Sequence, residues 1–168
     1  MDDQNTIELK FKLNLLTDLW KEFCEKHTEL YEYTCDEYMH LLSSDLDKLE
    51  LVIDSKKNLI GEINKLEDRR QDVTKEVSNL LNIEKPKTLS VLIDSLKLNQ
   101  EDASAMQIEK LNLVLLDIVN KIQEQNKKNQ VFLNRALLSL KELKDSFGGR
   151  TNYKTYSSTG LAKSNLSY

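Results

Sequence analysis

Apolar residues that recur every three or four positions are the feature that most constrains the fold of this chain. The pattern runs from Leu9 to Phe147, and such spacing places side chains on one face of an α-helix. Only one proline and four glycines interrupt the 168 residues, so the sequence offers few breaks or turns. With 39% apolar and 31% charged residues, the composition suits helices that bury one face and expose the other. The chain is therefore predicted to be all-α.

The first two helices are delimited by a polar turn and by the proline. A continuous stripe up to Leu41 predicts a helix over residues 6–42. Ser43, Ser44 and Asp45 then supply side-chain acceptors suited to the first amides of a new helix. We expect a tight turn there and a second helix antiparallel to the first, ending before Pro86, which disfavours helix in the preceding residue.

The remainder of the chain predicts one short and one long helix. Residues 88–97, with Thr88 as a candidate cap, carry an apolar run too short to form a stable helix alone. The last stripe extends from Ile108 to Phe147, and Gly148-Gly149 follows it, as is typical of a helix C-terminus. We predict an elongated antiparallel bundle of three long helices plus a short connecting helix over residues 1–148. Residues 149–168, poor in aliphatic side chains, are expected to form a flexible C-terminal tail.

Charge and hydropathy exclude several classes of function. The net charge of -4 comes from 24 basic and 28 acidic residues that are mixed along the chain, so no basic face indicates nucleic-acid binding. The first ten residues, MDDQNTIELK, lack the apolar run of a secretory signal. No segment approaches the roughly 18 uninterrupted apolar residues of a membrane span. We expect a cytoplasmic protein without stable membrane insertion.

Catalytic and metal-binding motifs are not evident in the sequence. It contains no phosphate-binding glycine loop, nucleophile elbow or paired-cysteine metal site, so we expect neither an enzyme nor a cofactor. Cys24 and His27 lie three residues apart on one helical face, but two ligands do not make a metal site, and we interpret them as packed core residues. Cys35 follows Cys24 by eleven residues, roughly 16 Å along a helix, which is beyond disulfide reach.

Four polar residues interrupt the apolar stripes: Lys56, Arg70, Gln125 and Asn129. Such residues can fix the register between helices at some cost in stability. Alternatively, Lys56 and Arg70 lay their aliphatic stems on the core and extend their charges to water. Either role is structural.

The C-terminal half of the last helix carries an unusually wide apolar face. Its seam consists of Phe132, Ala136, Leu140, Leu143 and Phe147, and three leucines widen it, namely Leu133, Leu137 and Leu138. The other helices of the bundle could cover this surface. If they do not, apolar surface of that breadth indicates a partner, such as a helix laid in the groove.

Several short motifs in fixed order give the chain a family resemblance. They read Asp45-x3-Leu49-x6-Lys56-x2-Leu59-Ile60-x2-Ile63-x2-Leu66-x3-Arg70, then Asn126-x2-Asn129-x3-Leu133, then Tyr156-x3-Gly160. In this order the sequence resembles the FlgN-like family of flagellar export chaperones, from about residue 9 to residue 160. Members are small cytosolic helical proteins, not enzymes, that hold hook-filament junction proteins (hook-associated proteins) before their export through the flagellar type III apparatus.

The resemblance implies two binding sites. The family's C-terminal helix holds the C-terminal region of the client, which would place that contact here on Asn129, Phe132, Leu133, Ala136, Leu137, Leu140, Leu143 and Phe147. A tyrosine in the family's tail helps to dock the chaperone at the cytoplasmic domain of the export gate. Tyr156, four residues before Gly160, resembles that tyrosine, and Tyr153 is the competing candidate.

The wide apolar face is also compatible with two further classes of protein. One is a self-associating structural coiled-coil or adaptor protein, in which a second copy covers the face and the unliganded chain is a homodimer. The second is a membrane-surface amphipathic protein, which would use the basic residues of the last helix (Lys127, Lys128, Arg135, Lys141 and Lys144). Glu142 and Asp145 interrupt that basic face and argue against it.

Overall fold

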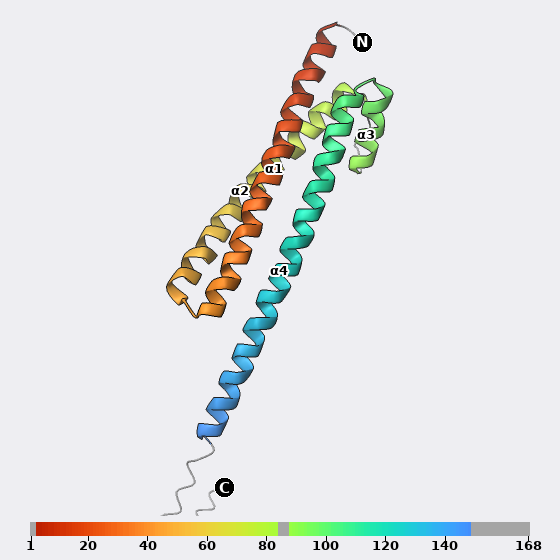
Figure 1. The fold of residues 1–168 in the computed structure, drawn as a ribbon. Helices are drawn as coiled ribbons and strands as arrows, with labels where there is room; N and C mark the ends of the chain where they lie inside the picture. The colour runs from red at the N-terminus through yellow and green to blue at the C-terminus, as the bar shows by residue number, and fades with distance from the viewer. Residues whose placement is uncertain (1–2, 84–87, 149–168) are drawn as a thin grey trace, which may run out of the picture. The chain divides into compact units, whose positions relative to one another are not determined.

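The computed structural model describes residues 3–83 and 88–148, and this part of the chain contains four α-helices and no strand (Figure 1). The helices are α1 (Asp3–Ser43), α2 (Leu46–Leu80), α3 (Leu89–Leu98) and α4 (Asp102–Gly148). The prediction of an all-α chain with three long helices and one short helix is confirmed. Residues 149–168 lie outside the described residues, so the expected tail and its boundary at residue 148 stay predictions.

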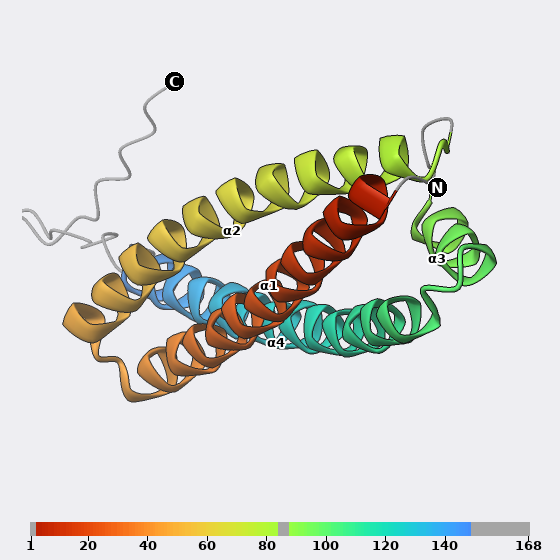
Figure 2. The same cartoon turned by 90° about the horizontal axis from the view of Figure 1, so that it is seen from above.

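The chain divides into two compact units, Met1–Asn129 and Gln130–Tyr168. α4 contributes its first part to one unit and its last part to the other. In the first unit, α1 and α2 form an antiparallel pair, which the two perpendicular views show side by side (Figures 1 and 2). α3 and the first part of α4 complete this unit.

The turn between α1 and α2 forms for the reason that the sequence indicates. Asp45 is the N-cap of α2, and its Oδ1 accepts a hydrogen bond of 3.2 Å from the backbone N–H of Lys48. The Lys48 ammonium also pairs with this carboxylate at 3.0 Å, and Lys48 holds the pKa of Asp45 below its usual value. Ser44 adopts a φ of 57°, which reverses the chain. Thr88 occupies the N-cap position of α3, but its side chain makes no capping hydrogen bond.

The core of the first unit draws residues from all four helices. α1 contributes Leu9, Leu13 and Leu16; α2 contributes Leu59, Ile63, Leu66, Val73 and Val77; α3 contributes Leu92, Ile93 and Leu96; and α4 contributes Ala105, Ile108 and Leu115. A fully buried leucine contributes about 1.5–3 kcal/mol. Leu92 and Leu96 therefore hold α3 in place, although its ten residues are too few for a stable isolated helix.

A polar cluster joins α1, α2 and α4 near the end of the first unit. The Lys56 ammonium pairs with Glu37, and it also donates to Asn126 Oδ1 over 3.4 Å. Buried Asn129 donates from Nδ2 to the Thr34 carbonyl at 3.0 Å. Because these bonds connect specific positions on three helices, the cluster fixes their register. Of the two alternatives for Lys56, the structure favours a residue that links the helices.

Arg70 likewise makes specific contacts. Its Nε and Nη2 both donate to the Glu67 carboxylate at 2.7 Å, and its guanidinium lies 4.8 Å from the centre of the Trp20 ring. The paired guanidinium lowers the pKa of Glu67. Of the two alternatives for Arg70, the structure favours a residue that links α2 to α1.

Candidate functional site

The candidate site lies on the described part of the second unit, residues 130–148, which form the end of α4. Five leucines and two lysines, both strong helix formers, stand in this segment. Its apolar side chains are exposed apart from half-buried Phe132, with Leu137 and Leu140 each 63% and Phe147 71% accessible. Exposed side chains of this size and number are uncommon on a chain that works alone.

These side chains share one face. At about 100° of rotation per residue, seven apolar side chains fall within an arc of about 140°, and the charged Lys144 lies within the same arc. They are Phe132, Leu133, Ala136, Leu137, Leu140, Leu143 and Phe147, and we call this set the apolar face. Arg135, Lys141, Glu142 and Asp145 project from the remaining circumference. The segment is therefore amphipathic, and its apolar face is broad enough to pack against a partner helix along its length.

Leu138 does not belong to this face. It is 61% exposed, but by the same rotation it points away from the centre of the apolar face, among the charged residues. The expectation that Leu138 widens the seam is wrong for this geometric reason. Leu138 instead provides an exposed leucine on the opposite side of the same helix, which makes it a useful control.

Asn129 differs from the other candidate client-binding residues. Only 2% of its surface is exposed, and it belongs to the first unit. Its Oδ1 accepts from Gln125 Nε2 at 3.0 Å, and its Nδ2 is committed to the Thr34 carbonyl. A client would reach this amide only by replacing those bonds, so we omit Asn129 from the apolar face.

Other candidates have ordinary structural surroundings or fall outside the described chain. Cys24 donates from Sγ to the Leu111 carbonyl at 3.4 Å, and burial raises the pKa of its thiol. His27 Nδ1 lies 2.7 Å from the Phe23 carbonyl oxygen. Within residues 3–83 and 88–148 no three potential metal ligands gather. Tyr153, Tyr156 and Gly160 lie outside the described residues.

One feature was missed by sequence reasoning. A cleft of about 930 Å³ in the first unit is lined by residues of all four helices, including Trp20, Arg70 and Leu92. Its residues come from positions far apart in the chain, so no local motif marks it. Trp20 lies in the apolar stripe of the first predicted helix between Leu16 and Phe23, and this spacing indicates only that its side chain faces inward.

Comparison with known families decides the class of protein. The chain matches the family model described as FlgN protein over residues 12–164. The chain belongs to the FlgN family. No curated protein and no solved structure matches it.

Membership of the FlgN family confirms the resemblance drawn from the short motifs. It implies a flagellar export chaperone that binds hook-associated proteins, and FlgN proteins are chaperones, not enzymes. None of the helices within the described ranges has both the length and the apolar content needed to cross a membrane.

Proposed function

We propose that this FlgN-family chain is a cytoplasmic chaperone that binds the C-terminal region of hook-filament junction proteins through its apolar face. The observation that carries the proposal is the exposure of this face, from half-buried Phe132 to Phe147. An amphipathic helix of the client, laid along the face, would bury the apolar surface of both partners. The client segment would then be protected from premature association and from degradation.

The energetics suit a reversible complex. Full burial of each large apolar side chain contributes about 1.5–3 kcal/mol before the entropy lost on association is counted. Leu137, Leu140, Leu143 and Phe147 are each more than half exposed, so covering them can support micromolar binding without a permanent assembly. Such a complex can still release its client at the membrane.

The second step of the proposed function is delivery to the export gate. We assign the docking contact to Tyr156, with Gly160 four residues later and Tyr153 as the competing residue. A tyrosine can bury its ring in a partner's pocket while its hydroxyl keeps a hydrogen bond. The support for this assignment is the order of the tail motif in the sequence and the family match, which extends to residue 164.

Calorimetric titration with the C-terminal segment of a junction protein from the same organism tests the client site. The wild type should bind at micromolar strength or better. Leu140→Asp should weaken binding at least tenfold, and its combination with Phe147→Asp should abolish it. Loss of the far-UV helical signal together with binding would instead indicate damage to the fold.

Leu138→Asp is the matched control, because Leu138 and Leu140 are almost equally exposed on opposite sides of one helix. It introduces the same charge two residues away and should leave affinity within about twofold. Equal losses in Leu138→Asp and Leu140→Asp would contradict a binding site on one face.

Self-association is the competing explanation of the exposed face. In that case a second copy would cover the face, and the free chain would be a dimer whose contact includes Phe132 to Phe147. Light scattering distinguishes the two, since the chaperone binds its client one to one. A concentration-dependent dimer that Leu140→Asp converts to monomer, with no client bound, would favour the adaptor.

A further inference from the structure

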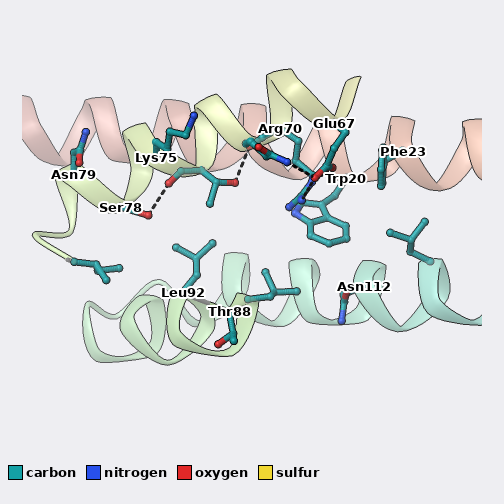
Figure 3. A pocket seen from close by; sticks show the side chains of 15 residues that line it. Trp20, Phe23, Glu67, Arg70, Lys75, Ser78, Asn79, Thr88, Leu92 and Asn112 are labelled. Atoms are coloured by element: carbon teal, nitrogen blue, oxygen red, sulfur yellow. Dashed lines mark hydrogen bonds and ion pairs between the residues drawn. The ribbon is translucent and has the colours of Figure 1, made fainter. Parts of the chain in front are cut away.

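Apolar side chains that face solvent also occur in the first unit, on α2. The cleft beside Trp20 (Figure 3) differs from them, because most of its apolar lining belongs to the chain's own buried core. On α2, by contrast, Leu46 is 72%, Ile53 49% and Ile60 44% exposed. We call these three residues the α2 stripe. Their exposure marks a surface that the described part of the chain leaves uncovered.

The spacing of the α2 stripe suits contact with another helix. Its members recur every seven residues, so they lie within an arc of about 40° and extend about 21 Å along the helix. They point about a third of a turn away from Leu59 and Ile63, which belong to the core. α1 lies along α2 in both views (Figures 1 and 2) and shares that core. An apolar residue at every seventh position is the pattern of a helix that packs along a second helix.

Two charged residues flank the stripe on one side. Glu50 and Lys57 lie about 50° from its centre. Both are exposed, and neither takes part in an ion pair within residues 3–83 and 88–148. The flank therefore offers one negative and one positive charge, seven residues apart, to whatever covers the stripe.

A second, antiparallel copy of α2 complements both the stripe and its flank. With the two Ile53 side chains on a two-fold axis, Leu46 of each copy lies level with Ile60 of the other. Glu50 then lies within one residue, about 1.5 Å along the helix, of the level of Lys57 of the second copy. The two-fold axis repeats each contact, so two such ion pairs form beside the apolar residues.

The direction of pairing follows from these charges. In an antiparallel pair the two flanks adjoin, because the two-fold axis leaves them on the same side of the interface. In a parallel pair they would lie on opposite sides, and Glu50 and Lys57 would not meet. Charge complementarity therefore favours an antiparallel second copy as the occupant of the stripe.

We propose that the α2 stripe binds a second copy of this chain in an antiparallel, two-fold arrangement centred on Ile53. Three partly exposed side chains from each copy make a small interface, so the dimer is weak and depends on concentration. The contact uses α2 alone, and each copy keeps its own apolar face for one client. The inference does not rest on the proposed function.

Light scattering of the full chain over micromolar to millimolar concentrations tests this contact. The mass of the wild type should rise from that of a monomer toward that of a dimer. Ile53→Asp should weaken the dimer at least about tenfold, because it brings two carboxylates together on the axis. Leu51→Asp is the matched control, since Leu51 is 68% exposed on the opposite side of α2. It should leave the mass at each concentration unchanged, and circular dichroism verifies the fold of both variants.

Reversal of the flanking charges tests the antiparallel register. Glu50→Lys alone and Lys57→Glu alone should each weaken the dimer by about threefold or more, because like charges then face each other. The double variant should restore the affinity of the wild type. Two weak single variants without recovery in the double variant would overturn the proposed register.

A thiol cross-link tests the position of the axis. In a chain with Cys35→Ser, Ile53→Cys should join two copies through a short thiol-specific reagent, since residue 53 meets its own counterpart. Leu51→Cys in the same background should not, because it points away from the interface. Equal yields of cross-linked dimer would overturn the arrangement.

The outcomes separate this inference from the proposed function. A mass that stays at that of a monomer at every concentration overturns the α2 contact and leaves the chaperone function standing. So does a wild type that stays monomeric while Ile53→Asp abolishes client binding, since the stripe then belongs to the client site. A dimer that Leu140→Asp disrupts and Ile53→Asp does not would mean that copies meet through the apolar face, which also overturns the proposal.

Discussion

The two parts of α4 follow one sequence pattern but have opposite exposure. Ile108, Leu115, Ile122 and Asn129 repeat at intervals of seven and are all buried in the first unit. Ala136 and Leu143 continue the same interval in the second unit, yet both are exposed. Apolar periodicity therefore identifies the face of a helix that is suited to burial. It does not show whether the same chain or a partner buries that face.

This difference has a physical consequence for stability and binding. In the first part of α4, apolar burial contributes to folding of the chain itself. In the second part the same kind of side chain contributes little until a partner arrives. Most of the stability of a helix in a protein comes from packing of its apolar face, and this face is exposed in residues 130–148, so client binding should also stabilise them as helix.

The largest expected effect compares Ile108→Ala with Leu143→Ala. Ile108 is 0% exposed and Leu143 is 53% exposed, although they share the seven-residue register. Ile108→Ala should lower the free energy of unfolding by about 2–5 kcal/mol because it leaves a cavity. Leu143→Ala should lower it by less than about 0.5 kcal/mol. Urea unfolding followed by circular dichroism measures both.

Client binding should reverse that order. Leu143→Ala should weaken the complex, whereas Ile108→Ala should change affinity only as far as it unfolds the chain. A cost for Leu143→Ala close to that of Ile108→Ala, in the absence of client, would show that the apolar face is already covered in the free protein.

A smaller effect compares two asparagines on either side of the division between the units. Asn129 is buried and bonded to Thr34 and Gln125, whereas Asn134 is exposed. Asn129→Ala should lower the free energy of unfolding by about 1–2 kcal/mol, because it removes both the hydrogen bond to the Thr34 carbonyl and the one from the Gln125 amide. Asn134→Ala should be neutral or slightly stabilising, since alanine has the higher helix propensity. Urea unfolding measures both variants. Equal changes in the free energy of unfolding for Asn129→Ala and Asn134→Ala would contradict a role for Asn129 in fixing the register of the helices.

The sequence predicted the helices closely because their signals are local. Residues 6–42 were expected for the first helix, and α1 covers Asp3–Ser43. The cap at Asp45 was also recognisable, since it depends on a side chain and a backbone amide three residues apart. Each of these features is determined by neighbouring residues.

The features that sequence reasoning missed or left open depend on distant residues. The burial of Asn129 depends on the Thr34 carbonyl, 95 residues away. The cleft at Trp20 requires four helices to be placed around it. The apolar face could be located from spacing alone, but its exposure could not, because Leu115 and Leu143 occupy equivalent positions in the repeat and differ only in what surrounds them.

The smallest expected effect compares two glutamates, one paired in the first unit and one exposed in the second. The Arg70 guanidinium lowers the pKa of Glu67 below its ordinary value of 4.5. The carboxyl therefore stays ionised to a lower pH in the folded chain than in the unfolded chain. The pair therefore stabilises the fold above about pH 4.5. That contribution is lost as the pH falls through the lowered pKa.

Because Glu67 is partly exposed to solvent, its contribution should be well under about 1 kcal/mol. Glu67→Gln should lower stability slightly at pH 7 and make the decline below pH 4.5 shallower, as measured by urea unfolding across a pH series. Glu142→Gln, at an exposed position of the second unit, should leave the free energy of unfolding at pH 7 unchanged. If the two variants behave alike, the Glu67–Arg70 pair does not stabilise the first unit, and Arg70 acts there through its contact with Trp20 alone.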